Sequence, residues 1–124
     1  MVVSERVDGI FQALADPTRR EIVGLVLATD QSVTELARRF PMSFAAVQKH
    51  VAVLERAGLV TKERRGREQR VRGNADALHE ARRLLDQLEE VWRGRVARIG
   101  ALLAADQQAD QQAGRQTDER EKDS

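Results

Sequence analysis

The stretch Ser32–Arg72, SVTELARRFPMSFAAVQKHVAVLERAGLVTKERRGREQRVR, predicts two helices joined by a tight break and followed by an arginine-rich hairpin. Ser32 and Glu35 have the spacing of a capping box, in which two side chains satisfy free backbone N–H groups at the start of a helix. The pattern predicts a short amphipathic helix over Val33–Phe40. Pro41 ends it, because proline cannot continue the hydrogen-bond ladder and disfavours helical geometry in the preceding residue.

A second helix follows this break. Ser43 is the expected N-cap, since a serine hydroxyl can accept a hydrogen bond from a backbone N–H in the first turn. The helix is expected to run to Ala57 and to stop at Gly58, where glycine permits the left-handed backbone that ends many helices. Two helices with so short a connection are typical of a helix-turn-helix.

The hairpin is expected to consist of strands Leu59–Arg65 and Gln69–Arg72 on either side of Gly66. Segment Lys62–Arg72 holds six bases and two acids, a net charge of +4, whereas the whole chain carries +1. Such clustering without interleaved aromatic residues fits contact with a polyanion better than base stacking on a single strand. A merely solvated hairpin is the alternative. Together the helices and hairpin predict a winged helix-turn-helix that binds double-stranded DNA.

Composition limits what else the protein can be. A chain of 124 residues supports one domain, and with no Tyr, one Trp and three Phe its core must be aliphatic. The absence of cysteine excludes disulfides, thiolate metal sites and cysteine redox switches, and it fits a reducing compartment. No window approaches 18 uninterrupted apolar residues and no signal pattern opens the chain, so we expect a cytoplasmic protein that does not bind membranes.

Two helices are expected before this stretch. The first starts near Ser4 and ends near Leu14, with apolar residues at helical spacing. Asp16 and Pro17 predict the start of the second, with aspartate as N-cap and proline at the first helical position. It is expected to end near Ala28.

A long helix is expected to follow the hairpin, capped by Asn74 and reaching about Ala105. At about 1.5 Å per residue its 30 or so residues would span roughly 45 Å, which overhangs so small a core. Its apolar stripe would be exposed to solvent in a monomer, so we expect a homodimer. The expected interface residues are Phe11, Leu85, Leu88, Trp92, Val96, Ile99 and Leu103.

The fold class expected from these elements is mainly α with a small β-hairpin, a winged helix-turn-helix with a long C-terminal dimerisation helix. Residues 1–105 would form the DNA-binding and dimerisation domain. The segment 106–124 contains a repeated Asp-Gln-Gln-Ala and six acids against three bases, so we expect a disordered charged tail.

Three blocks of the chain resemble the ArsR/SmtB family of bacterial winged-helix repressors. They are FQALADPTRR (Phe11–Arg20), VTELA (Val33–Ala37) and the run from Met42 to Val60, which contains VQKH and LERAGLV. The resemblance covers about residues 8 to 104. It implies a homodimer at the bacterial nucleoid, with the helix after Ser43 in the major groove and repression that a signal releases.

The resemblance also raises the question of metals, because many family members sense them through a cysteine pair or through Asp, His and Glu on the dimer helix. This chain has no cysteine, and its only histidines are His50 and His79. A zinc site would need three or four converging ligands. Glu89 and Glu90 are available to His79, but no second histidine lies nearby in that helix. We therefore expect no metal and no cofactor; a small-molecule or lipid effector, a partner protein or no ligand at all stay open.

Candidate DNA contacts follow from how a recognition helix meets the major groove with its N-terminal turns. Gln48 can pair with adenine and Lys49 with guanine or a phosphate, while Arg67 at the wing tip suits a narrow minor groove. For Phe44 a groove-facing and a core position are both open, and for Ser43 capping is preferred to phosphate contact. The residues expected at DNA are Thr34, Arg38, Ser43, Phe44, Ala45, Gln48, Lys49, Arg64, Arg65, Arg67 and Arg70.

Two other classes of protein are alternatives. An enzyme would need convergent acids, an activated nucleophile or a metal, and the two histidines lie far apart in the predicted fold, so we expect no enzyme. A protein-interaction module, in which the long helix binds another protein and DNA binding is secondary, is the alternative to a dimeric repressor. The basic wing argues against interaction alone.

Overall fold

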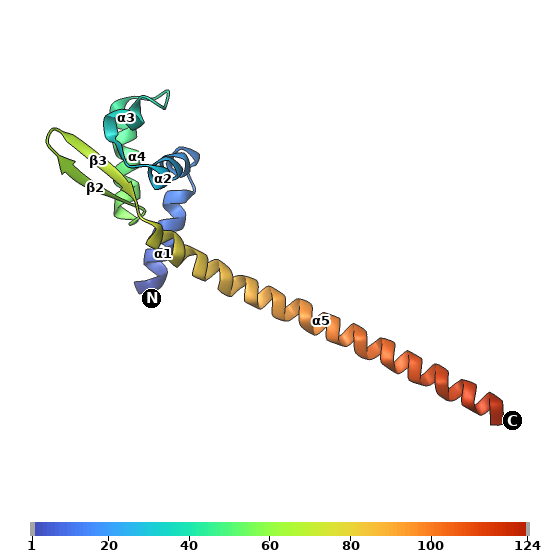
Figure 1. Cartoon of the computed structure of the whole chain (residues 1–124). Helices are drawn as coiled ribbons and strands as arrows, with labels where there is room; N and C mark the ends of the chain where they lie inside the picture. Colours follow the sequence, from blue (N-terminus) through green and yellow to red (C-terminus); the bar gives the residue numbers. More distant parts are fainter. Residues whose placement is uncertain (1, 124) are drawn as a thin grey trace. The chain divides into compact units, whose positions relative to one another are not determined.

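The computed structural model describes the backbone of residues 2–123 and the side-chain environments of residues 5–114. It divides into two compact units, Met1–Leu84 and Leu85–Ser124. The elements, in chain order, are α1 (Val2–Leu14), α2 (Pro17–Ala28), β1 (Gln31–Ser32), α3 (Val33–Ala37), α4 (Phe44–Arg56), β2 (Val60–Arg65), β3 (Glu68–Gly73) and α5 (Ala75–Asp123) (Figure 1). This is the expected winged helix-turn-helix with a long C-terminal helix.

Hydrogen bonds between side chains and backbone groups stabilise both helix ends at the junction of α1 and α2. Asp16 caps α2, since its Oδ2 accepts a hydrogen bond from the backbone N–H of Arg19 at 2.9 Å. That bond is the main cause of the lowered pKa of the Asp16 carboxyl. The side chains of Arg19 and Arg20 turn back and donate to the last carbonyls of α1, at Ala13 (2.7 Å) and Leu14 (2.8 Å). A single short motif thus ends one helix and starts the next.

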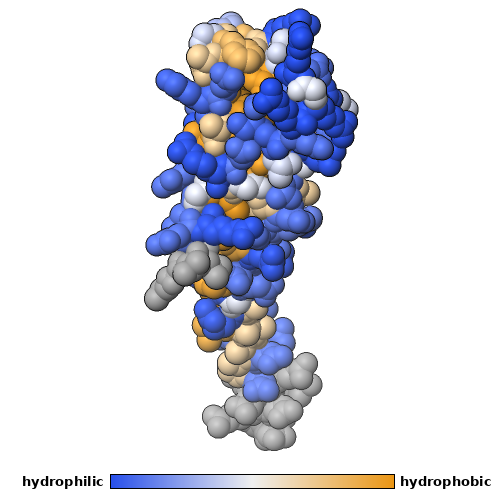
Figure 2. Space-filling view, turned by 90° about the vertical axis from the view of Figure 1, so that its left-hand side faces the viewer, coloured by the Kyte–Doolittle hydropathy of each residue, from blue (hydrophilic) through white to orange (hydrophobic). Residues whose placement is uncertain are grey.

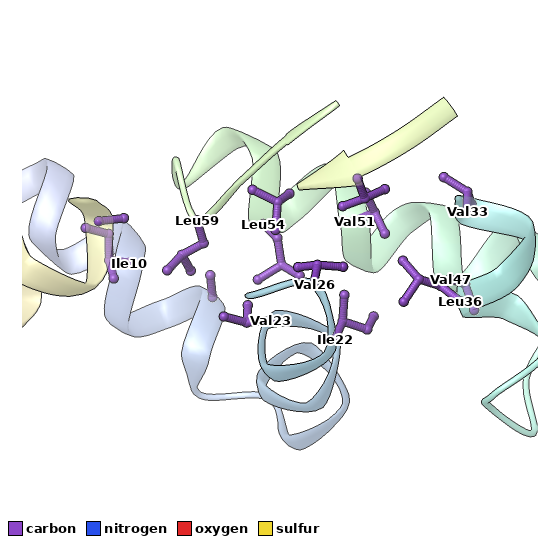
Figure 3. Packing of buried hydrophobic residues seen from close by; sticks show 14 of the residues in the cluster. Ile10, Ile22, Val23, Val26, Val33, Leu36, Val47, Val51, Leu54 and Leu59 are labelled. Carbon is purple, nitrogen blue, oxygen red and sulfur yellow. The ribbon is translucent and has the colours of Figure 1, made fainter. Parts of the chain in front are cut away.

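The core of the first unit is aliphatic, as the composition predicted. Side chains from α1, α2, α3 and α4 and from the base of the hairpin meet in one cluster (Figure 3). Its largest fully buried members are Ile10, Ile22, Val26, Leu36, Val47, Val51, Leu54, Leu59, Val60 and Val71. Burial of such side chains contributes roughly 1.5–3 kcal/mol each relative to exposure.

The first helix of the helix-turn-helix is shorter than expected. Helix α3 ends at Ala37, where Val33–Phe40 was predicted, and the chain continues in turns, with Arg39 N–H donating to Leu36 O at 3.0 Å. Phe40 is buried in the core rather than continuing the helix. The difference follows from Pro41, which disfavours helical geometry in Phe40, and from the packing of that phenyl ring.

The sheet contains one strand that the sequence did not reveal. Its order is β1-β3-β2, all antiparallel, with Gln31 opposite Val71 and Ser32 opposite Arg70. Gln31 lies between the expected end of the second helix near Ala28 and the expected start of the next at Val33, and it is part of a strand. A two-residue strand has no readable periodicity, and its partner lies about 40 residues further along the chain.

Helix α5 begins in the first unit, where the Asn74 side chain accepts from Asp76 N–H at 3.2 Å and donates to Gly58 O at 2.9 Å. Ala77 and Ala81 are buried there. The helix continues past the expected end near Ala105 to Asp123, so the segment predicted to be disordered is helical. Ala, Gln, Glu and Arg are good helix formers, and no proline stops propagation. The domain boundary at residue 105 stays a prediction. Among the described residues, no helix is long and apolar enough to span a membrane.

Gly73 supplies a test of the packing between the wing and α2. A Cβ placed on Gly73 would lie 2.9 Å from Leu27 Cα and 2.7 Å from its Cδ2, and the Leu27 backbone cannot move without shifting α2. We expect Gly73→Ala to lower the free energy of unfolding by about 1–3 kcal/mol. Urea denaturation at fixed protein concentration measures the change.

Gly24 is the matched control. It is exposed within α2, and a Cβ there would meet nothing within 4 Å. Gly24→Ala should raise the free energy of unfolding by up to about 1 kcal/mol, because alanine has the higher helix propensity. Equal effects at the two glycines would contradict the proposed close approach at Gly73.

Candidate nucleic-acid interface

Helix α4 has two distinct faces. Its inner face consists of Val47, Val51 and Leu54, none of which has exposed surface, and they anchor the helix in the core (Figure 3). Its outer face carries the exposed residues predicted to read DNA, namely Phe44, Ala45, Gln48 and Lys49. Because the inner face is fixed, the outer side chains are presented from a rigid support.

Two residues at the start of α4 had alternative roles in the sequence analysis, and the structure shows the environment of each. Ser43 Oγ accepts from Ala46 N–H at 3.1 Å, so the hydroxyl caps the helix, which was the preferred interpretation. Phe44 is 46% exposed, so of its two alternatives the structure shows the surface position. An exposed phenyl in the first turn of a recognition helix can contact thymine methyl groups.

Thr34 lies in α3 and Arg38 directly follows that helix as its C-cap, and both are exposed. Within the described part of the chain, neither side chain takes part in a hydrogen bond or an ion pair. Arg39, next in sequence, is exposed in the same way and was not among the predicted contacts. These cations are available to a phosphate backbone.

Among the cations of the wing, those at its tip are the least engaged with other groups of the protein. Arg67 makes no hydrogen bond or ion pair with any described residue, and Arg64 makes only a 3.4 Å hydrogen bond to Gly66 O. Arg65 pairs with Glu63 at 3.8 Å, and both side chains are more than half exposed. A pair so exposed contributes little to stability, so these arginines keep most of their capacity for phosphate.

Arginines at the base of the wing are differently placed. Arg70 is half-buried and donates to Asp30 O (2.9 Å) and Glu35 Oε1 (3.4 Å), and Arg72 Nε donates to Asp30 Oδ2 (3.1 Å). Lys62 lies 3.6 Å from Glu55. Counting charge along the sequence therefore overstated the cations free for DNA, because these acids lie elsewhere in the chain and only folding brings them to the wing.

The two histidines are surrounded differently. His50 Nδ1 lies 3.9 Å from Asp16 Oδ2, so this side chain of α4 lies beside the N-cap of α2, whereas His79 is exposed on α5. Within the part of the chain that the structure describes, no group of three or more His, Asp or Glu residues is arranged to hold a metal.

A shallow groove of about 360 Å³ lies between α1 and α4. Gly9, Ala13 and Val53 form its apolar part, and Arg19 and Arg56 lie at its sides. Nothing on these walls identifies an effector, and the expected small-molecule or lipid ligand stays a prediction.

The predicted dimer stripe is exposed along α5, where hydrophobic residues lie between charged ones (Figure 2). Trp92 is 57% exposed, with the Arg95 guanidinium 6.0 Å from its ring centre. Phe11 differs from the other predicted interface residues, since it is half-buried against the core of its own unit. The exposed stripe residues are Leu85, Leu88, Trp92, Val96, Ile99 and Leu103.

An exposed reading face on α4, a basic wing beside it and a core that fixes both define a winged helix-turn-helix DNA-binding protein. Residues 14–63 match the family model described as a helix-turn-helix domain. The chain is 35% identical to an ArsR-like transcriptional regulator from Rhodococcus sp. RHA1 (TM-score 0.71), over 80% of this chain and 93% of that one. It belongs to the ArsR family of transcriptional regulators.

Two curated relatives match a shorter part of the chain. Identity is 30% with the transcriptional repressor SdpR of Bacillus subtilis, over 48% of this chain and 66% of that repressor. Identity is 49% with the HTH-type transcriptional regulator Rv2034 of Mycobacterium tuberculosis, over 43% of this chain and 50% of that regulator. The matches thus span half to two thirds of these relatives. The family is one of DNA-binding regulators rather than enzymes.

Proposed function

We propose that this protein is a dimeric repressor that binds an inverted-repeat operator on the bacterial chromosome. Each subunit places α4 in the major groove and its wing against the neighbouring backbone. The B. subtilis relative is named a transcriptional repressor, which favours repression over activation. A repressor occupies its site without recruiting polymerase, so DNA binding and dimerisation are the only activities this role requires.

The observation that carries the proposal is the division of α4 into two faces. Val47, Val51 and Leu54 fix the helix to the core. The side chains of Gln48 and Lys49 extend from the opposite side and make no hydrogen bond or ion pair with a described residue. A glutamine side chain that bonds to no described residue can offer both donor and acceptor to adenine, and an unpaired lysine side chain can reach guanine or phosphate.

Dimerisation accounts for the exposed stripe of α5. Six large apolar side chains on one helix would leave several hundred square ångströms of hydrophobic surface in water, which monomeric proteins rarely show. Pairing two copies through this stripe gives a twofold axis, and two recognition helices then fit half-sites about 10 bp apart, or a multiple of that spacing.

Selection of bound fragments from random duplex DNA tests the proposal. The full chain should enrich an inverted repeat, and its affinity for that sequence should exceed its affinity for unrelated duplex by about 10³-fold or more. Sedimentation of the complex should give two chains per operator. Enrichment of no sequence, or binding equally tight to all duplexes, would overturn the proposed function.

Substitutions should distinguish the residues that contact bases from those that contact the phosphate backbone. Gln48→Ala and Lys49→Ala should relax sequence preference, since each base contact contributes about 1–3 kcal/mol of discrimination. Arg67→Ala should weaken binding to all sequences and flatten the plot of log affinity against log salt by about 0.9 for each phosphate that the variant no longer touches. Anisotropy titrations on operator and unrelated duplex at several salt concentrations measure both effects.

The two groups of variants control for each other, because all of these side chains are exposed and none supports the core. If Arg67→Ala changed the preferred bases while the α4 variants left preference intact, the roles of helix and wing would be exchanged.

A further inference from the structure

We infer that Arg70 orients the wing for DNA binding and does not itself contact the phosphate backbone. The inference rests on the proposed function, since it concerns how the arginines of the wing tip reach the backbone. It departs from the expectation drawn from the sequence, in which Arg70 was one of the residues in contact with DNA.

The guanidinium of Arg70 already has its partners inside the protein. One terminal nitrogen donates to Asp30 O at 2.9 Å, and the other lies 3.4 Å from Glu35 Oε1 and 3.7 Å from Glu68 Oε2. Only 24% of the side chain is exposed. These acceptors come from the loop before β1, from α3 and from β3 itself. A planar guanidinium with several donors in fixed directions is suited to hold three segments in one arrangement.

Arg72 strengthens the same attachment. Its Nε donates to Asp30 Oδ2 at 3.1 Å, so Asp30 receives one arginine on its backbone carbonyl and another on its carboxylate. The backbone pairing of β1 with β3 lies between these contacts, with Ser32 opposite Arg70. The base of the hairpin is thus tied to the residues that lead into α3.

Helix α3 is the common support. It packs against β3 on one side and against α4 on the other. Whatever fixes β3 to α3 therefore also fixes the direction of the wing relative to the reading helix. The arginines at the wing tip that pair with no acid, Arg64 and Arg67, can reach DNA only if the hairpin has the required orientation relative to α4.

The two roles for Arg70 predict opposite effects of one substitution at Glu35. If Arg70 gripped a phosphate, the Glu35 carboxylate would only compete for it and repel DNA, so its neutralisation would tighten binding. If Arg70 positions the wing, Glu35 is one of its anchors, and Glu35→Gln will weaken binding although a negative charge is removed. Glutamine keeps the spacing of the capping box, and the bond from Glu35 N–H to Ser32 Oγ involves only the backbone of residue 35.

Glu63→Gln is the matched control. Glu63 also lies on the wing, but its ion pair is the exposed one with Arg65, within the hairpin. Operator affinity is measured by anisotropy over a range of salt. We expect Glu35→Gln to bind several-fold more weakly than wild type, with a salt slope lower by about 0.9 for each phosphate that the wing no longer reaches, and Glu63→Gln to bind at least as tightly as wild type. Glu35→Gln binding as tightly as Glu63→Gln would overturn the inference.

Arg70→Lys adds a second comparison. Lysine keeps the charge but cannot bond to three segments at once, so a positioning role predicts that affinity stays low, whereas a phosphate contact predicts near-complete rescue. Wild-type affinity in Arg70→Lys would overturn the inference.

A measurement without DNA separates failure of this inference from failure of the proposed function. Backbone ¹⁵N relaxation of the free protein should show lower order parameters across Val60–Gly73 in Glu35→Gln and Arg70→Lys, and unchanged ones in Arg67→Ala. If the wild type bound no duplex, the proposed function would fail, yet this comparison would still decide the role of Arg70. A hairpin as rigid in both variants as in the wild type would overturn that role.

Discussion

Trp92→Asp will abolish dimerisation and, with it, measurable operator binding. Trp92 is the largest apolar side chain of the exposed stripe on α5. Its burial contributes roughly 2–3 kcal/mol per subunit from area alone. An aspartate at this place would put a charge into the proposed apolar interface, and an unpaired buried charge is strongly destabilising.

DNA affinity should fall further than the absence of one subunit suggests. Two linked half-site contacts exceed a single one by about 10²–10⁴-fold, because the second binding event is intramolecular. A monomer therefore binds the operator little better than unrelated duplex. Analytical ultracentrifugation and anisotropy on the same preparation measure dimerisation and DNA affinity together.

Ala101→Asp is the control. Ala101 is exposed on α5 and lies on the opposite side of the helix from Trp92, nine residues along at about 100° per residue. The variant introduces the same charge in the same helix and should remain a dimer. A Trp92→Asp protein that stayed dimeric would show that another surface forms the interface.

Leu54→Ala will lower the free energy of unfolding by about 2–5 kcal/mol, enough to unfold a marginal domain. Leu54 has no exposed surface and joins α4 to the cluster contributed by α1, α2 and the hairpin base. Removing three carbon atoms leaves a cavity where neighbouring side chains can relax only in part. Urea denaturation followed by circular dichroism, at one protein concentration for all variants, measures the change.

Gln48→Ala, on the outer face of the same helix, should change the free energy of unfolding by less than about 0.5 kcal/mol, as exposed substitutions usually do. It should nevertheless relax sequence preference. The two variants thus distinguish the buried face of α4, which stabilises the fold, from its exposed face, which is proposed to contact bases. Comparable destabilisation by both would contradict an orientation of α4 with Leu54 inward and Gln48 outward.

Local signals were the ones that could be predicted from the sequence. Asp16, Ser43 and Asn74 all cap the helices they were expected to cap, because a cap depends on residues two or three positions away. The turn at Gly66 was found for the same reason, and Gly66 has φ +60°. The buried positions Val47, Val51 and Leu54 are spaced four and three residues apart, a local pattern that follows from helical periodicity.

Long-range pairings could not be predicted. Strand β1 has two residues and exists only through β3, and the role of Arg70 depends on Asp30, 40 positions away. A count of charges in Lys62–Arg72 gives the correct sign for the wing but cannot tell that Arg70 and Arg72 are already paired. Predicting which residues of α4 could contact DNA requires only the helical period. Predicting the same for the base of the wing requires knowledge of its partners in the folded structure.

The strand order of the small sheet also bears on solubility. With β3 in the centre, β2 has an outer edge whose backbone groups pair with no described strand, and such edges invite strand addition from another copy and hence aggregation. Four of the six residues of β2, Lys62 to Arg65, are charged, and charge along an edge opposes such addition. The basic side chains of β2, through which the wing is proposed to attract DNA, thus also oppose self-association of the protein through the sheet edge. Variants that strip several of them together should precipitate more readily as well as bind DNA more weakly.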